Sequence, residues 1–251
     1  MNLKKQMTNR FKLLLLPFLE WYTKRKIKQF DKYDILPAFK LMVMGYGRHG
    51  KDTVCDILSD VYGLSFKSSS YAAATFLYDK LKDEFGYTSV DECFNDRHNH
   101  RQRWFNEIAK LTEQDQTKLA RHIFQNSAIY CGIRRLEEFE AAKKEKLFYT
   151  SIWVDASARV APEGVESCTV TPSCAEYVLS NNGTLVDLRW NVNKLVNKIV
   201  EDFIDYMTLT EIMIEVLDKE NNSSYRVYFK TFDQAAEFSK NNPQLVFNIY
   251  F

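Results

Sequence analysis

Short apolar runs alternate with helically spaced apolar positions through the middle of the chain. Residues 41–44 (LMVM) form a continuous apolar run of the kind that fills a buried strand. Between residues 52 and 62, apolar side chains recur at 54, 57, 58 and 61, the spacing of a helix with one buried face. The same criteria predict strands at 64–66, 127–132, 150–154 and 175–179, and helices at 71–85, 136–146, 185–207 and within 86–126.

This alternation predicts an α/β fold with a parallel sheet, because parallel neighbours need helical crossovers. Gly132 interrupts its strand and is followed by Arg134 and Arg135. The fold would bring these arginines to the carboxyl edge of the sheet, where open α/β proteins bind ligands. Residues 208–251 show a second pattern, β-β-α-β, which predicts a small α+β extension. Packing, self-association into a homo-oligomer and binding of another partner are the roles left open for it.

The first 39 residues predict a basic amphipathic arm. Residues 1–40 carry ten Lys or Arg against three acids, whereas the whole chain of 251 residues has a net charge of +1. The apolar run at 11–19 contains Pro17 and is far shorter than the ~20 residues that span a bilayer. We therefore expect no transmembrane segment. The arm either contacts an anionic surface or a partner, or packs on the body as a leading helix.

The composition is that of a globular protein, with 45% hydrophobic residues and only 8 Gly and 5 Pro. The five cysteines form no C-x-x-C pair. This pattern favours reduced thiols and a cytoplasmic location, which would be the host cell cytoplasm if the protein is viral.

A glycine-rich loop follows the first strand. Residues 45–53 (GYGRHGKDT) match the phosphate-loop pattern G-x-x-x-x-G-K-[ST], with one residue inserted before the hydroxyl. Glycines let successive amides face phosphate oxygens, and the next helix adds the positive end of its dipole. The alternative is a glycine-rich turn that binds no ligand. We expect nucleotide binding by Gly45, Gly47, Arg48, His49, Gly50, Lys51, Asp52 and Thr53.

Other polar groups are candidates for a second ligand. The serines at 68–70 precede a helix and would either cap it or hydrogen-bond a phosphate. Arg97 and Arg101 are spaced i, i+4 and would share a helix face that suits phosphate oxygens, unless that face is only solvated. The loop at 156–175 is long for a compact domain and predicts a lid.

Together these motifs resemble a known family. The segments GYGRHGKDT, YCGIRR, IWVD and AEYVLSNNGTL, in this order, resemble a P-loop nucleoside monophosphate kinase, in particular the bacteriophage deoxynucleoside monophosphate kinases. The resemblance covers about residues 40–207 and implies a three-layer kinase fold. It also implies ATP as phosphoryl donor and a nucleoside monophosphate as acceptor. Dephospho-CoA kinases share a similar N-N-G turn and are the nearest alternative.

The resemblance implies roles for individual residues. Lys51, Arg134 and Arg159 would be catalytic, with Arg48 and Arg135 as further cations for the transition state. The turn with Asn182 and Gly183 would lie against the ATP base. The acceptor would be bound by Ser68, Ser69, Ser70, Arg97, Arg101, Arg134 and Arg135.

The metal role is implied less directly. Either Thr53 or Asp52 would supply the oxygen ligand for Mg²⁺. Many relatives have an aspartate at the end of the third strand, where Tyr130 and Cys131 stand here, and their lids usually offer several arginines where this one offers a single arginine.

The sequence therefore predicts ATP-dependent phosphorylation of a (deoxy)nucleoside monophosphate to the diphosphate, in support of nucleotide supply. Two alternatives stay open. A dephospho-CoA kinase-like enzyme would phosphorylate a ribose hydroxyl. A degenerate nucleotide-binding module would act through a partner held by the arm or the extension.

Overall fold

The computed structural model describes residues 3–32, 36–164, 167–209, 212–218, 223–229, 232–242 and 246–250. Its helices are α1 (Leu3–Lys32), α2 (Lys51–Tyr62), α3 (Ser69–Phe85), α4 (Val90–Asp96), α5 (Arg101–Glu113), α6 (Lys118–Asn126), α7 (Leu136–Lys144), α8 (Leu185–Leu209) and α9 (Phe232–Asn241), with 3-10 turns at Leu36–Ala38 and Pro172–Cys174. Its strands are β1 (Leu41–Met44), β2 (Phe66–Ser68), β3 (Ile129–Cys131), β4 (Thr150–Asp155), β5 (Tyr177–Ser180), β6 (Ile212–Asp218), β7 (Ser223–Phe229) and β8 (Val246–Tyr250).

A five-stranded sheet of order β2-β3-β1-β4-β5 forms the centre of the body, and all its neighbouring strands are parallel. The predicted α/β fold with a parallel sheet is confirmed. The chain leaves β1 for the edge strand β2, returns to β3 beside β1, and then crosses to β4 and β5 on the other side. A ligand of such a sheet is expected at the carboxyl ends of the central strands, where the direction of winding changes.

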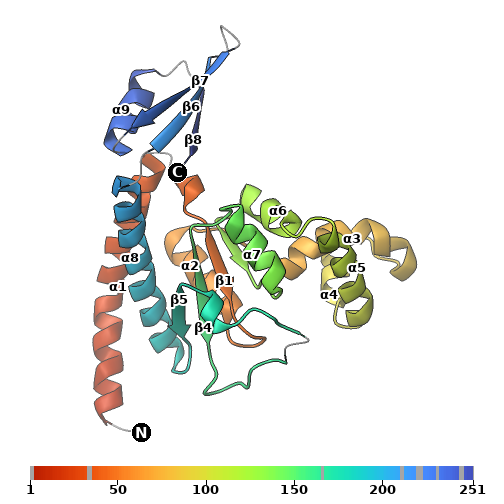
Figure 1. Ribbon diagram of the computed structural model, residues 1–251. Helices are drawn as coiled ribbons and strands as arrows, with labels where there is room; N and C mark the ends of the chain where they lie inside the picture. The colour runs from red at the N-terminus through yellow and green to blue at the C-terminus, as the bar shows by residue number, and fades with distance from the viewer. Residues whose placement is uncertain are drawn as a thin grey trace.

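Alternate side chains of β1 face two separate hydrophobic cores. Leu41 and Val43 pack in a core with residues of α1, α2 and α8, whereas Met42 and Met44 pack in a core with residues of α3 to α7. All four side chains are fully buried. Helices therefore cover both faces of the sheet and produce three layers (Figure 1).

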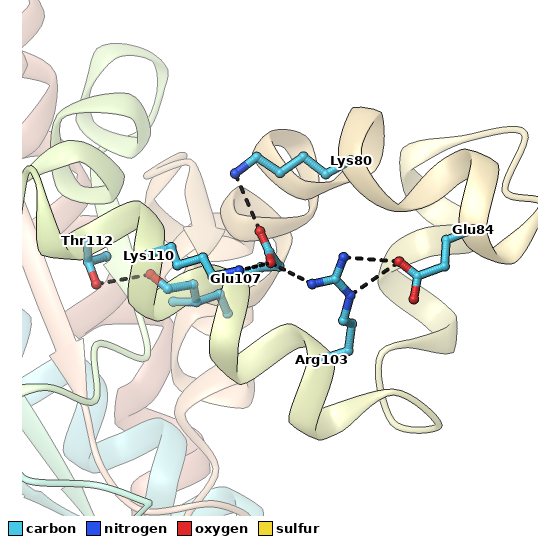
Figure 2. Close-up of polar contacts among 7 residues, drawn as sticks. Lys80, Glu84, Arg103, Glu107, Lys110 and Thr112 are labelled. Carbon is cyan, nitrogen blue, oxygen red and sulfur yellow. Dashed lines mark hydrogen bonds and ion pairs between the residues drawn. The ribbon is translucent and has the colours of Figure 1, made fainter.

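A charged network joins α3 to α5 (Figure 2). The buried carboxylate of Glu107 contacts Arg103 at 2.6 Å, Lys110 at 2.9 Å and Lys80 at 3.5 Å. Arg103 also contacts Glu84 at 3.0 Å. The hydrogen bond from Lys110, together with Arg103, lowers the pKa of Glu107. Several cations thus compensate the burial of one carboxylate and fix the position of α5 on α3.

Two strands begin two residues later than predicted. The backbone N–H of Leu64 still donates a hydrogen bond to the carbonyl of Leu58 at the end of α2 (3.4 Å), so β2 begins only at Phe66. The amide of Ala175 closes the preceding 3-10 turn, so β5 begins only at Tyr177.

The prediction that Arg97 and Arg101 share a helix face is wrong. The helix α4 ends at Asp96, and α5 starts at Arg101 after a turn. The Asp96 carboxylate accepts hydrogen bonds from the Asn99 amide group (2.5 Å) and the Tyr87 hydroxyl (2.8 Å). Side-chain bonds of this kind compete with helical backbone bonds and favour a turn.

The basic N-terminal segment forms a single helix along the outer side of α8 (Figure 1). Leu16, Ile27 and Phe30 are buried in this contact, as the packed-helix alternative predicts. The helix continues through Pro17. Proline has no N–H for the carbonyl one turn earlier in the helix, but Pro17 is exposed, so water can hydrogen-bond that carbonyl instead. Among the residues that the structure describes, no helix combines the length and the apolar character needed to cross a membrane.

The C-terminal extension has the predicted order β-β-α-β. Its antiparallel sheet has the order β7-β6-β8, and α9 lies between β7 and β8 in the chain. Val216 of β6 is fully buried and belongs to the same core as α1, α2 and α8, and Phe229 and Phe238 pack against this core. The extension is therefore continuous with the main body.

Candidate phosphate-binding site

The loop between β1 and α2 needs glycine at two positions. Gly45 and Gly50 have φ angles of +149° and +90°. A Cβ atom at Gly45 would lie 2.7 Å from the carbonyl oxygen of Val154, and one at Gly50 would collide with the side-chain amide of Asn181. Arg48 also adopts a positive φ of 62°. At Gly45 and Gly50 the loop therefore passes too close to the ends of β4 and β5 for a residue with a side chain.

Lys51 is the buried cation of this loop. Only 8% of the residue is exposed, and its Nζ donates a hydrogen bond to the carbonyl of Tyr46 (2.9 Å). Burial lowers the pKa of the Lys51 ammonium below its ordinary value. An ammonium held in a partly desolvated position interacts more strongly with an anion than one in water does.

The ends of three strands meet at Lys51. Gly132, which follows β3, has a φ of +89°, and a Cβ there would lie 3.6 Å from Lys51 Cε and 3.5 Å from Ser69 Oγ. Ser69, which follows β2, donates a hydrogen bond to the Gly132 carbonyl (2.8 Å). Lys51 and Ser69 were predicted as site residues, and the fold brings them together next to Gly132, the predicted strand break.

A carboxylate lies in a cradle formed by the backbone N–H of Gly47, the guanidinium of Arg134 and the nearby ammonium of Lys51. Glu163 Oε2 accepts a hydrogen bond from the backbone N–H of Gly47 at 2.6 Å and pairs with Arg134 Nη1 at 2.8 Å. Burial alone would raise the pKa of Glu163, but the Gly47 amide, Arg134 and the nearby Lys51 outweigh it and the pKa is lowered. Three groups predicted to bind phosphate thus converge on one anionic group of the chain itself. Glu163 lies in the predicted lid and was not among the predicted site residues.

The side chain of His49 forms hydrogen bonds to the loop that follows β4. It is fully buried, Nδ1 accepts a hydrogen bond from the amide of Ala156 (3.1 Å), and Nε2 donates to the carbonyl of Val160 (3.1 Å). Both ring nitrogens are therefore used by the loop that follows β4. His49 anchors this loop, and its own backbone carbonyl accepts a hydrogen bond from the Asn181 side chain (2.9 Å).

The turn of residues 181–183 (NNG) forms hydrogen bonds with the same loop, which follows β4. Asn182 accepts a hydrogen bond from the Ala158 amide (2.9 Å) and donates one to the Asp155 carboxylate (2.8 Å). Arg159 Nε donates to the carbonyl of Asn181 at 2.8 Å. The turn therefore holds the Arg159 guanidinium in this arrangement, and the catalytic role of Arg159 stays a prediction. Gly183 is exposed at the start of α8.

The predicted acceptor residues divide into two groups. Ser68 caps α3 by accepting from the Tyr71 amide (3.2 Å), which was one of the two expectations for the serines, and Ser70 Oγ lies 3.5 Å from Ser68 Oγ. Arg97 lies over the Phe94 ring, 3.8 Å from its centroid, and burial lowers its pKa while nearby Asp52 opposes this. Arg97 therefore lies near Asp52, at the end of the glycine-rich loop of residues 45–53.

Two other arginines belong to the predicted acceptor set. Arg101 is exposed at the first turn of α5. Arg135 lies over the ring of Phe105 at 5.3 Å and 4.0 Å from the carboxylate of Glu138, so its guanidinium is directed toward α5 and α7. The contact of these two arginines with the acceptor phosphate stays a prediction.

The predicted metal ligands begin α2. Asp52 and Thr53 are both exposed there, and Cys131 Sγ lies 3.5 Å from Asp52 Oδ1. Within the described part of the chain, no group of three or more His, Cys, Asp or Glu side chains is arranged to hold a metal. A carboxylate and a hydroxyl at this position fit Mg²⁺, which keeps several waters and needs only one or two protein ligands when it also binds phosphates.

Comparisons with known proteins add no family name. No protein-family model matches the chain, and no curated protein matches its sequence.

Proposed function

We propose that the chain is an ATP-dependent kinase that transfers a phosphoryl group to a (deoxy)nucleoside monophosphate and forms the diphosphate. The observation that carries this proposal is the anion held by the Gly47 amide and Arg134 beside the buried Lys51. A carboxylate and a phosphate present the same kind of charged oxygen to an N–H group and a guanidinium. The cradle is therefore built for anionic oxygens at the carboxyl edge of a parallel sheet.

In this proposal the loop of residues 45–53 holds the ATP phosphates, and Lys51 neutralises charge on the group that moves. Arg134 interacts with the acceptor phosphate or the transferred group, and Ser69 and Arg97 lie on the acceptor side of the cradle. Mg²⁺, ordered by Asp52 or Thr53, would offset further phosphate charge. Catalysis of phosphoryl transfer depends mainly on such positioning and charge compensation.

Two observations favour a second candidate, a module that binds nucleotide without turnover. Arg159, the arginine at the start of the predicted lid, is held by the carbonyl of Asn181. Cys131 occupies the strand end where the resemblance implies a carboxylate. The dephospho-CoA kinase-like reaction remains a further alternative, because the N-N-G turn is common to both families.

The test is ADP release from Mg-ATP with a panel of ribo- and deoxynucleoside monophosphates and with dephospho-CoA. Lys51→Ala is compared with Lys143→Ala, which removes an exposed cation from α7. Stimulation by one or a few monophosphates, lost only in Lys51→Ala, supports the proposal. Stimulation by dephospho-CoA alone supports the alternative acceptor. ATP binding without turnover in any mixture supports the binding module.

A further inference from the structure

The helix α1 has a well-defined inner face. Leu16, Thr23, Ile27 and Phe30 are buried against the body. Ion pairs from Lys12 to Asp187 (2.6 Å), from Glu20 to Arg189 (2.8 Å) and from Lys26 to Glu201 (2.6 Å) tie α1 to α8. These contacts fix the rotation of α1 about its axis, so the opposite face is held outward along the edge of the molecule (Figure 1).

The first half of this outer face is apolar. Phe11, Leu14, Phe18 and Trp21 are 62%, 75%, 66% and 54% exposed. Their spacing of three, four and three residues places them in one stripe along the helix. Four large apolar side chains in one exposed stripe are unusual for a soluble surface and mark an interaction site.

The second half of the outer face is cationic. Lys24, Arg25 and Lys28 are exposed and continue the same side of the helix. Arg25 lies over the Trp21 ring, 5.7 Å from its centroid, where the two halves meet. Between residues 11 and 30 the one acid is Glu20, and it is turned to Arg189. The outer face therefore has positive charge that no acid of its own neutralises.

Charge decides which occupant this face suits. Two copies packed in parallel would place the cations at 24–28 next to each other. Two antiparallel copies would place them next to the other end of α1, whose sequence contains Lys4, Lys5 and Arg10. Like charges would face each other in both arrangements. A nucleic acid would match the cations but leaves Leu14 and Phe18 without apolar contact. An anionic bilayer matches both halves, because apolar side chains enter the acyl boundary while cations meet the headgroups.

We propose that the outer face of α1, made of Phe11, Leu14, Phe18, Trp21, Lys24, Arg25 and Lys28, binds the surface of an anionic lipid membrane. The helix lies in the plane of the interface, and α8 connects it to the parallel sheet. This proposal does not depend on the proposed kinase activity, because none of these residues belongs to the phosphate loop or its surroundings.

The test is sedimentation of the full chain with vesicles of phosphatidylcholine, with and without phosphatidylserine. We expect binding to the anionic vesicles, a loss of binding at high salt, and a blue shift of tryptophan emission. Trp21 is the exposed reporter, because Trp104 and Trp153 are buried and Trp190 on α8 is half-buried, and Trp21→Phe provides the emission baseline of the other three.

Matched variants separate the two halves of the face. Phe18→Glu should lower the partition constant at least about tenfold, and Lys24→Gln and Arg25→Gln should each lower it about fivefold. Tyr228→Glu, at a residue 62% exposed in the extension, and Lys143→Gln should leave it unchanged. Melting curves of all variants verify the fold.

Three results would overturn the proposal. The first is equal binding to neutral and anionic vesicles, and the second is binding that Phe18→Glu does not reduce. The third is that the chain does not bind vesicles but forms a dimer or a nucleic-acid complex, and that the same substitutions abolish this complex. That result would assign the face to that partner.

Discussion

The carboxylate of Glu163 accepts a hydrogen bond from the backbone amide of Gly47 at 2.6 Å, across 116 residues of sequence. The same oxygen pairs with Arg134. If this cradle binds nucleotide phosphates, Glu163 must leave it first, since two anions cannot share one amide and one guanidinium. The loop after β4 then acts as an internal competitor of the ligand.

Glu163→Gln should therefore tighten ATP binding. The substitution keeps the shape of the side chain but removes the charge that holds the Gly47 amide and Arg134. A partly exposed ion pair contributes only about 1 kcal/mol, so we expect the Kd for Mg-ATP to fall about fivefold. Isothermal titration calorimetry measures it, with the exposed Glu140→Gln as control. A weaker or unchanged Kd would show that Glu163 does not compete with the nucleotide.

The position of the glycine-rich loop at residues 45–53 was predictable because its information is local. Gly45, Gly50 and Lys51 follow one strand and precede one helix, so their spacing alone determines where the loop lies relative to the sheet. The carboxyl-edge position of Gly132 also followed from the alternation of strands and helices, since consecutive parallel strands end on the same side.

The contacts across the loops were not predictable in the same way. Glu163, Asn181 and Asp155 lie far along the chain from the residues they contact, and no local pattern marks their partners. Arg97 and Arg101 had helical spacing, but side-chain bonds to Asp96 ended the helix between them. Arg159 was assigned to the moving phosphate from its place in the lid, whereas the carbonyl of Asn181 holds it.

His49 should act as a positioning residue for the loop after β4. His49→Leu keeps much of the volume but leaves the Ala156 amide and the Val160 carbonyl without their partners. Unpaired buried groups cost about 1–3 kcal/mol each, so we expect the free energy of unfolding to fall by about 2–4 kcal/mol. Proteolysis within residues 156–164 should also accelerate.

Urea unfolding and limited proteolysis measure these two effects. The matched control is His98→Leu, at an exposed position between α4 and α5. Equal stability of His49→Leu and the wild type would mean that water replaces both hydrogen bonds and that His49 does not hold the loop.

Glu138 should make stability fall as the pH rises toward neutrality. Burial raises the pKa of its carboxyl from 4.5 to about 7, and Arg135 only partly opposes this. The folded state then binds more protons than the unfolded state between these two values, so the free energy of unfolding decreases across this window. Above about pH 7 the folded protein carries the full cost of a buried carboxylate.

Glu138→Gln removes that cost. We expect similar stability to the wild type near pH 4.5 and a gain of about 2 kcal/mol at pH 8, measured by urea unfolding. Glu140→Gln, at an exposed position of the same helix, should change the free energy of unfolding little and equally at both pH values. A gain for Glu138→Gln that is the same at both values would exclude titration as its cause.

Asp187 should have the opposite pH dependence, because it joins α1 to the start of α8. Its carboxylate accepts a hydrogen bond from Lys12 at 2.6 Å and another from the Thr184 amide at 2.9 Å. The Lys12 bond, followed by the Thr184 amide, lowers the pKa of Asp187 from 3.8 to about 2. The charged form therefore stabilises the folded state above about pH 4, and this contribution is lost as the pH falls through about 2.

Asp187→Asn should consequently lower the free energy of unfolding by about 1–2 kcal/mol at pH 7 and by much less at pH 2.5. Lys12→Met should lose less, because the Thr184 amide keeps its acceptor, and the double variant should show coupling between the two sites. Lys82→Met, which breaks an exposed pair on α3 with Asp79, is the control and should change stability little. Equal losses for Asp187→Asn at both pH values would mean that packing and not charge holds α1 on α8.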